Sequence, residues 1–183
     1  MTDESVWNGR IAPPAELPEV IGRLGALSTS RGGVEIFETT TPFPSTWFLH
    51  AYVALLDGQP AMFVTCKSDS SGIKWVHVVW AREDVRGGHA LSHSGATFPV
   101  QIGRWLFDDG HLTHHSSDRT PAGDRWAHEV GGVLLPLDPK GDPEATARSS
   151  KRAFDLLCQV DWPTVPRAGN TSSSDHAPAS ADE

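Results

Sequence analysis

Histidine is the residue type with which this sequence could do most chemistry. The chain of 183 residues has nine histidines, and eight of them lie between residues 50 and 128. An imidazole titrates near neutral pH and is a frequent metal ligand, so a histidine in a pocket can act as a general acid or base. The elements that position these histidines therefore decide what chemistry the sequence predicts.

The first of these elements is a β-hairpin that turns at Asp57-Gly58. An Asp-Gly pair between two apolar runs is a strong signal for a tight hairpin turn. Alternation along the two strands places Val53 opposite Met62 on an apolar face that points to the core. The opposite face then collects aromatic and hydrogen-bonding side chains, among them His50, Tyr52 and Thr65.

A second Asp-Gly pair, Asp109-Gly110, predicts a second hairpin in the same way. Its register places Trp105 opposite His114 on an apolar face, where burial would keep the imidazole neutral and able to accept a proton. The other face looks solvated and carries Arg104, Asp108, His111, Thr113 and His115.

Between the two hairpins lie a strand and a long connection. Residues 73–82 are apolar on both faces, which is typical of a central strand covered on both sides, and they contain His77. Residues 83–99 are glycine-rich and contain His89 and His93, so we expect a mobile lid over a pocket. The i, i+4 spacing of these two histidines lacks matching carboxylates or thiolates, and we predict neither a metal ion nor a cofactor.

The remaining elements complete an α+β domain. Apolar spacing predicts a helix over residues 17–27, followed by a strand over 34–41. Residues 126–137 read as a further strand, and Asp142-Pro143 begins a second helix. We expect a curved antiparallel sheet of about seven strands with the N-terminal and C-terminal helices packed on one face. The predicted domain spans residues 13–167, after an irregular arm (1–12) and before a disordered tail (168–183).

Charge and composition exclude several classes of protein. The net charge is −8, the acidic residues gather partly at the two termini, and no run of Lys or Arg occurs. Binding to a nucleic-acid backbone needs a basic patch, so we expect no nucleic-acid partner. Apolar runs are too short to span a membrane, and no secretory signal is apparent, which favours a cytoplasmic protein. Cys66 and Cys158 lie in apolar surroundings and read as buried thiols.

Two functions remain open. The first is a small-molecule-binding protein, and with it a small enzyme that uses a pocket histidine as general acid or base. Its catalytic candidates are His50 and His114, and its ligand-binding candidates are Tyr52, Thr65, His77, His89, His93 and Trp105. The alternative is a non-catalytic interaction protein, such as an inhibitor or immunity-type partner. Tryptophans at the ends of secondary-structure elements, among them Trp7 and Trp126, would then anchor the partner protein. The two hypotheses separate on one point, since the first requires His50 and His114 to face the same cavity.

Overall fold

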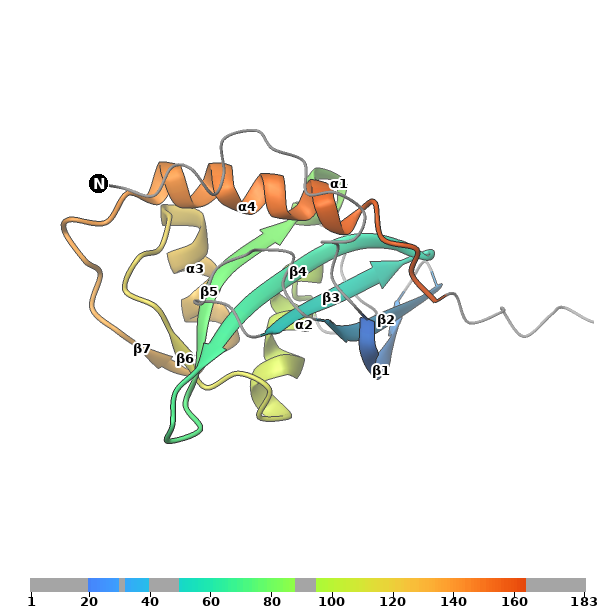
Figure 1. The fold of residues 1–183 in the computed structure, drawn as a ribbon, viewed down its shortest axis with the longest axis horizontal. Coiled ribbons are helices and arrows are strands. Elements are labelled where there is room, and N and C mark those ends of the chain that lie inside the picture. Colours follow the sequence, from blue (N-terminus) through green and yellow to red (C-terminus); the bar gives the residue numbers. More distant parts are fainter. Residues whose placement is uncertain (1–19, 30–31, 40–49, 88–94, 164–183) are drawn as a thin grey trace, which may run out of the picture.

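Seven strands form one mixed sheet whose order in space follows the chain (Figure 1). The computed structural model describes residues 20–29, 32–39, 50–87 and 95–163. Five antiparallel strands come first, namely β1 (Val20–Thr29), β2 (Gly32–Thr39), β3 (His50–Leu56), β4 (Gln59–Ser68) and β5 (Lys74–Ala81). Two short strands then pair in parallel, β6 (His114–His115) with β5 and β7 (Val133–Leu134) with β6.

The helices follow the antiparallel strands and cover both faces of the sheet. They are α1 (Glu83–Arg86), α2 (Phe98–Asp108), α3 (Pro121–Val130) and α4 (Pro143–Leu157). Helix α4 runs across one face, in contact with β4 and β5, whereas α2 lies on the other face and α3 packs against α2 (Figure 1). Among the described residues, no helix is long and apolar enough to cross a membrane.

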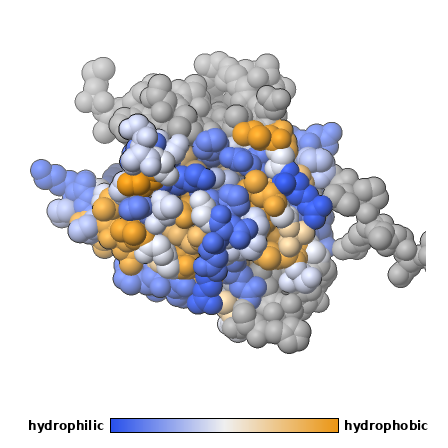
Figure 2. All heavy atoms as spheres, turned by 90° about the horizontal axis from the view of Figure 1, so that it is seen from below, coloured by the Kyte–Doolittle hydropathy of each residue, from blue (hydrophilic) through white to orange (hydrophobic). Residues whose placement is uncertain are grey.

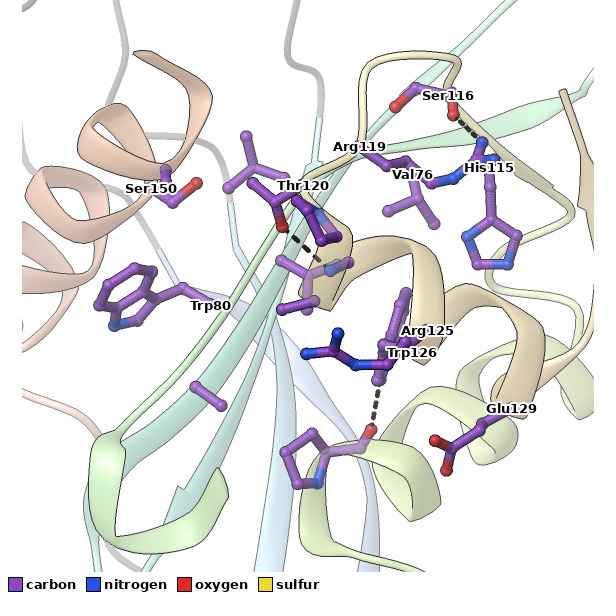
Figure 3. A pocket seen from close by; sticks show the side chains of 18 of the residues that line it. Val76, Trp80, His115, Ser116, Arg119, Thr120, Arg125, Trp126, Glu129 and Ser150 are labelled. Carbon is purple, nitrogen blue, oxygen red and sulfur yellow. Dashed lines mark hydrogen bonds between the residues drawn. The ribbon is translucent and has the colours of Figure 1, made fainter. Parts of the chain in front are cut away.

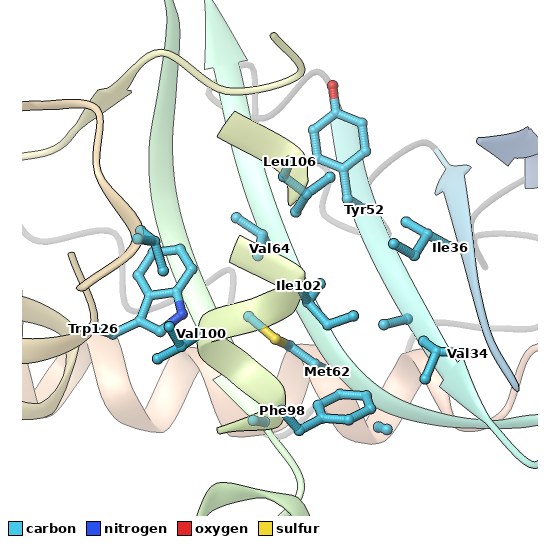
Figure 4. Packing of buried hydrophobic residues seen from close by; sticks show 14 of the residues in the cluster. Val34, Ile36, Tyr52, Met62, Val64, Phe98, Val100, Ile102, Leu106 and Trp126 are labelled. Carbon is cyan, nitrogen blue, oxygen red and sulfur yellow. The ribbon is translucent and has the colours of Figure 1, made fainter. Parts of the chain in front are cut away.

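Each face of the sheet has its own apolar core. On the α2 side, Met62 and Val64 of β4 pack with Phe98, Ile102 and Leu106, which recur every four residues along α2 (Figure 4). On the α4 side, Phe63 and Val78 pack with Phe154 and Leu157. Because side chains alternate along each strand, the central strands are buried on both faces and hold the two helical layers at fixed positions.

The hairpin predicted at Asp57-Gly58 is confirmed. Both turn residues have positive φ, 53° and 76°, and Leu56 pairs with Gln59 as expected. An irregularity follows at once, since Leu55 pairs with Pro60 and Ala54 with Met62. Ala61 is therefore an extra residue in β4 without a partner in β3. It moves the register by one, so that Val53 lies opposite Phe63 and not opposite Met62.

The second predicted hairpin is wrong, because Asp109-Gly110 ends helix α2. Gly110 has a φ of 74°, its N–H donates to the Phe107 carbonyl, and the N–H of His111 donates to the Leu106 carbonyl. These two hydrogen bonds close a Schellman motif, in which glycine ends a helix in the left-handed conformation. His115, expected on a solvated face, is buried in β6 with 1% of its surface exposed.

Three further expectations are corrected. Residues 20–29 form strand β1 and not a helix, and Gly25 packs against the Trp105 ring there. Residues 121–130 form helix α3 and not a strand, capped by the Thr120 side chain. The sheet is not strongly curled and is covered on both faces, so it does not carry two helices on one face. The C-terminal helix is confirmed as α4, with the Asp142 carboxylate accepting from the Ala145 N–H.

The surface mixes polar and apolar residues. Figure 2 shows one face of the molecule, where hydrophobic side chains form separate patches divided by hydrophilic ones. The large apolar side chains that are most exposed among the described residues are Ile21 on β1 and, on and after β7, Val133, Leu134 and Leu137. The predicted domain limits at residues 13 and 167 lie outside the described residues and stay predictions.

Candidate functional site

A cavity of about 780 Å³ lies beside β5, between helices α3 and α4 (Figure 3). Residues 76–81 of β5 line it on one side, and the first turn of α3 lines it on another. Ala147 and Ser150 of α4, together with Pro99 and Val100 of α2, complete its walls. Most of the surface that these residues expose to the cavity is apolar, although 11 of the 23 lining residues are polar or charged. An apolar surface with polar groups among it is usual in a small-molecule site.

The cavity follows the edge of β5 and not one of its faces. Val78 and Trp80 belong to the core on the α4 side, whereas Val79 and Ala81 pack on the α2 side, and all four line the cavity. Strand β6 pairs with β5 at Trp75 and Val76. From residue 77 to 81, no strand among the described residues pairs with this edge. Main-chain groups at this edge are therefore neighbours of the cavity.

His77 enters the cavity lining because β5 has a bulge at this residue. Cys66 of β4 pairs with Val76 and Thr65 pairs with Val78, which leaves His77 as the extra residue. Burial and the nearby positive charge of Lys67 lower the pKa of His77 to about 4, against an opposing effect of Asp118. At neutral pH the ring is therefore uncharged and offers one donor and one acceptor nitrogen.

Arg86 stands at the far end of the same edge. Its Nε donates to the Ala81 carbonyl at 2.6 Å, and its guanidinium carbon lies 4.2 Å from the centroid of the Trp80 ring. These two contacts hold the guanidinium plane over the indole. No carboxylate of the described residues pairs with Arg86, which leaves a positive group at this end of the cavity.

Arg119 fixes the wall that leads into α3. Its side chain is 9% exposed, pairs with Asp124 at 2.8 Å, and donates to the carbonyls of Ser116 and Leu135. Thr120 then caps α3 by accepting from the Gly123 N–H at 3.0 Å. Arg119 thus binds Asp124 and two main-chain carbonyls, and these contacts hold the cavity wall in place.

His115 also lines the cavity. Its ring stacks on Phe107, with centroids 4.6 Å apart, and meets Trp126 edge-on at 5.6 Å. Nε2 lies 2.7 Å from the Gly131 carbonyl and so carries the proton of the neutral ring. Nδ1 is buried without a hydrogen-bond partner, and burial lowers the pKa of the ring. His115 is therefore a neutral, packed residue in the structure.

Of the predicted site residues that the structure describes, His77 lines the cavity and the other five lie elsewhere. Tyr52 and Trp105 are brought together around His111, whose ring lies 5.5 Å and 5.3 Å from theirs. The Tyr52 hydroxyl donates to the His111 carbonyl at 3.3 Å, and burial raises the pKa of this phenol. Thr65 is on the opposite face of the sheet from Tyr52, since Tyr52 pairs with Val64.

The two predicted catalytic histidines do not meet. His50 shares the α2 side of the sheet with Tyr52, and its Nδ1 lies 2.9 Å from a Glu38 carboxylate oxygen. His114 pairs with Trp75 on the α4 side, and the two rings lie 4.6 Å apart at a tilt of 46°. Its Nδ1 is 3.0 Å from the Thr113 hydroxyl oxygen. The structure therefore does not bring His50 and His114 into one cavity.

His89 and His93 lie outside the described residues, so their predicted place in a lid is not tested. Part of the expected long loop is helical, as α1 and the start of α2. Within the described part of the chain, no group of three His, Cys, Asp or Glu side chains is arranged to hold a metal ion.

Sequence reasoning missed Arg86, Arg119 and Thr120 at the cavity. The Thr120-Pro121 pair is a common start of a helix and was available as a signal for α3. Arg86 follows Glu83 and Asp84, where it reads as one end of a charged loop. Its place beside Trp80 depends on the turn of α1 after β5, which a sequence pattern does not contain.

No family model, curated protein or solved structure matches the chain. The function is therefore argued from the geometry of the cavity.

Proposed function

We propose that this protein is a non-catalytic binding protein that holds a largely apolar ligand in the cavity beside β5. The observation that carries this proposal is the cavity of about 780 Å³, whose walls are mostly apolar. Its volume falls within the range of roughly 300–1,000 Å³ that is usual for ligand sites. His77, Thr120 and Arg86 are the polar groups that would orient the ligand.

Binding suits this cavity better than proton transfer. A general base works best when its pKa lies near the working pH. The pKa of His77 is lowered to about 4, so its neutral ring is a weak base and a good hydrogen-bonding group. The buried His115 is engaged in stacking and in its hydrogen bond to Gly131. His50 and His114 lie on opposite faces of the sheet, so the pocket expected around these two histidines is not the site proposed. The proposal concerns another cavity, the one beside β5, and assigns no catalytic role to either histidine.

The test is binding of a neutral apolar dye, Nile red, followed by its fluorescence. Ala147→Phe adds a ring at the α4 wall of the cavity and should weaken dye binding about tenfold or more. Arg152→Phe places the same ring on an exposed position of α4 outside the cavity and should leave binding unchanged. Circular dichroism and thermal unfolding confirm that both variants fold. Equal binding by both variants and the parent protein would place the dye elsewhere and refute the proposal.

A second function is favoured by the exposed apolar residues at the β7 edge. Val133 is 52% exposed and Leu137 is 51% exposed, although both are large and apolar. Apolar residues at a sheet edge suit contact with another protein, as in the interaction-protein alternative. The substitutions Val133→Ser and Leu137→Ser should abolish such a contact and leave dye binding in the cavity unchanged.

A further inference from the structure

We infer that the ligand of this cavity is an organic acid, an apolar chain or ring system whose carboxylate lies at the Trp80 end, where Arg86 and Arg125 present their guanidinium groups. This inference rests on the proposed function, because it names the chemical class of ligand that the same cavity takes. Three observations carry it: the two guanidinium groups, the placement of the acidic side chains, and the apolar walls.

Arg86 presents a guanidinium group that is held in place but not neutralised. Its Nε donates to the Ala81 carbonyl at 2.6 Å, and its guanidinium carbon lies 4.2 Å from the centroid of the Trp80 ring. Within the described ranges of the chain, no carboxylate pairs with this group and its terminal nitrogens donate to no acceptor. Those nitrogens can therefore form the two parallel hydrogen bonds by which a guanidinium binds a carboxylate.

Arg125 supplies a second guanidinium group from α3. Its side chain is exposed and lines the cavity, and Figure 3 shows its guanidinium pointing from α3 toward Trp80. In the part of the chain that the structure describes, this side chain makes neither an ion pair nor a hydrogen bond. Arg119, which lines the same wall, is paired with Asp124 and donates to two carbonyls. The two exposed arginines are thus available to a ligand, whereas Arg119 is not.

The acidic side chains that line the cavity lie away from the Trp80 end. Glu129 is in the last turn of α3, and Figure 3 shows its carboxylate at the end of that helix far from Trp80. A Cβ on Gly141 would lie 2.7 Å from an Asp118 carboxylate oxygen, which places this carboxylate against the loop before α4. The Trp80 end of the cavity is therefore positively charged, which favours a ligand with a negative group there.

The walls of the cavity suit an apolar body. Val78, Val100 and Trp126 are buried residues of the two cores, and Ala147 adds a methyl group from α4. The Trp126 Nε1 donates to the Pro99 carbonyl at 2.8 Å, so the indole offers the ligand an apolar ring. Burial of an apolar chain against these walls removes it from water. Because the two guanidinium groups are exposed, a carboxylate beside them keeps part of its hydration and avoids the cost of full burial.

The experiment is competition with Nile red by four ligands that share one chain: decanoic acid, decan-1-ol, decanamide and decylamine. The full-length protein is used at pH 7.5 and low ionic strength, with every ligand below the concentration at which it forms micelles. We expect decanoate to displace the dye at about tenfold lower concentration than the alcohol or the amide. Decylammonium should be the weakest competitor. Transfer from water alone would favour the neutral alcohol, so the expected order reports an ionic contact.

Arg86→Gln and Arg125→Gln assign this contact to the two arginines. Each variant should weaken decanoate binding about fivefold and leave Nile red and decan-1-ol binding unchanged. Glutamine retains a polar side chain without the charge, and thermal unfolding confirms that the variants fold. Arg148→Gln removes an arginine of α4 that is exposed and does not line the cavity, so it is the matched control and should bind decanoate like the parent protein. The double variant should lose the preference for the acid.

Failure of this inference is distinguishable from failure of the proposed function. If Nile red binds the cavity and decan-1-ol displaces it as well as decanoate does, the ligand is not an acid and the proposed function stands. If the preference for decanoate survives in the double variant, the role of the two arginines is refuted. If Ala147→Phe weakens binding of neither the dye nor decanoate, both proposals fail.

Discussion

Gly132 packs against the ring of Phe107 so closely that a Cβ on this glycine would lie 2.3 Å from the ring. Phe107 is the residue of α2 on which His115 stacks. Gly132 precedes β7, so this contact sets the distance between α2 and the outer parallel strands. The same packing fixes the wall of the cavity that contains His115 and Trp126.

Gly132→Ala should therefore destabilise the protein more than Gly131→Ala. Both glycines have positive φ, 90° and 89°, so alanine costs roughly 1–2 kcal/mol at either position. Gly131 has open space where a Cβ would lie, whereas Gly132 meets Phe107. Overpacking adds about 1–3 kcal/mol for Gly132→Ala alone. Urea unfolding gives the free energy of unfolding of both variants. Equal losses of stability would show that the Phe107 ring moves aside to admit the Cβ with no loss of stability.

Gly103 in α2 should also resist substitution. Alanine in the interior of a helix is usually favoured over glycine by about 1 kcal/mol. A Cβ at Gly103 would lie 2.5 Å from atoms of Trp126 and Val130, on the α3 side. We expect Gly103→Ala to lower the free energy of unfolding by about 1–2 kcal/mol despite the gain in helix propensity. Gly87→Ala, at a position with no atom within 4 Å of its Cβ, is the control and should be close to neutral.

His77 should make stability depend on pH below neutrality. Its pKa is about 4 in the folded protein and about 6.5 in an unfolded chain. Because the folded pKa is the lower one, the stabilisation is complete above pH 6.5 and is lost as pH falls toward 4. The loss should amount to about 2–3 kcal/mol over this window.

The matched measurement is urea unfolding of His77→Gln and His128→Gln between pH 4 and 7. The pH dependence should become shallower in His77→Gln, whereas His128→Gln removes a histidine whose side chain is 62% exposed and serves as the control. Part of the pH dependence of the unfolding free energy should remain in both variants, because burial also lowers the pKa of His115. An unchanged slope in His77→Gln would contradict the buried, neutral state of this ring.

The two cysteines should differ in reactivity. Cys66 is fully buried, as expected, and burial raises the pKa of its thiol to about 11. Cys158 was expected to be buried as well, but it is exposed at the C-cap of α4. The thiolate is the reactive form, so Cys66 is protected both by packing and by its pKa. Iodoacetamide at pH 8 should modify Cys158 in the native protein and both residues in urea. Modification of Cys66 under native conditions would show that the sheet opens on the α2 side.

Local signals predicted four of the five antiparallel strands, β2 to β5, and missed β1. Asp57-Gly58 turns a hairpin in which both residues adopt the positive φ that this dipeptide favours. The bulge beside Pro60 carries no equally strong signal, and it reversed which face each residue of β4 was expected to occupy. One inserted residue was enough to separate Thr65 from Tyr52.

The second Asp-Gly pair was misread because one dipeptide serves two purposes. Gly110 adopts a left-handed conformation in a helix C-cap as readily as in a hairpin turn. The period of four from Phe98 through Ile102 to Leu106 was the competing signal for a helix. Similarly, β1 holds two glycines, and its Val20, Leu24 and Leu27 recur at helical spacing; pairing with β2 decided its conformation. Tertiary contacts of this kind override local propensity.

The candidate site could be predicted only in part. His77 was identified, because it lies in a strand whose position the apolar pattern showed. Its neighbours in the cavity come from α1, α3 and α4, and their approach to one strand edge depends on the chain path after β5. Arg86 and Thr120 are separated by 34 positions in the sequence and are brought to one cavity by that path.

The most direct test of the cavity as a binding site is to map the backbone amide signals of isotope-labelled protein while Nile red is added. We predict that the changed signals cluster at residues 77–81 of β5, in the first turn of α3, and between Ala147 and Ser150 of α4. Changes centred instead on β7, or on the Tyr52 and Trp105 side of the sheet, would contradict the account, as would binding that leaves the β5 signals unmoved.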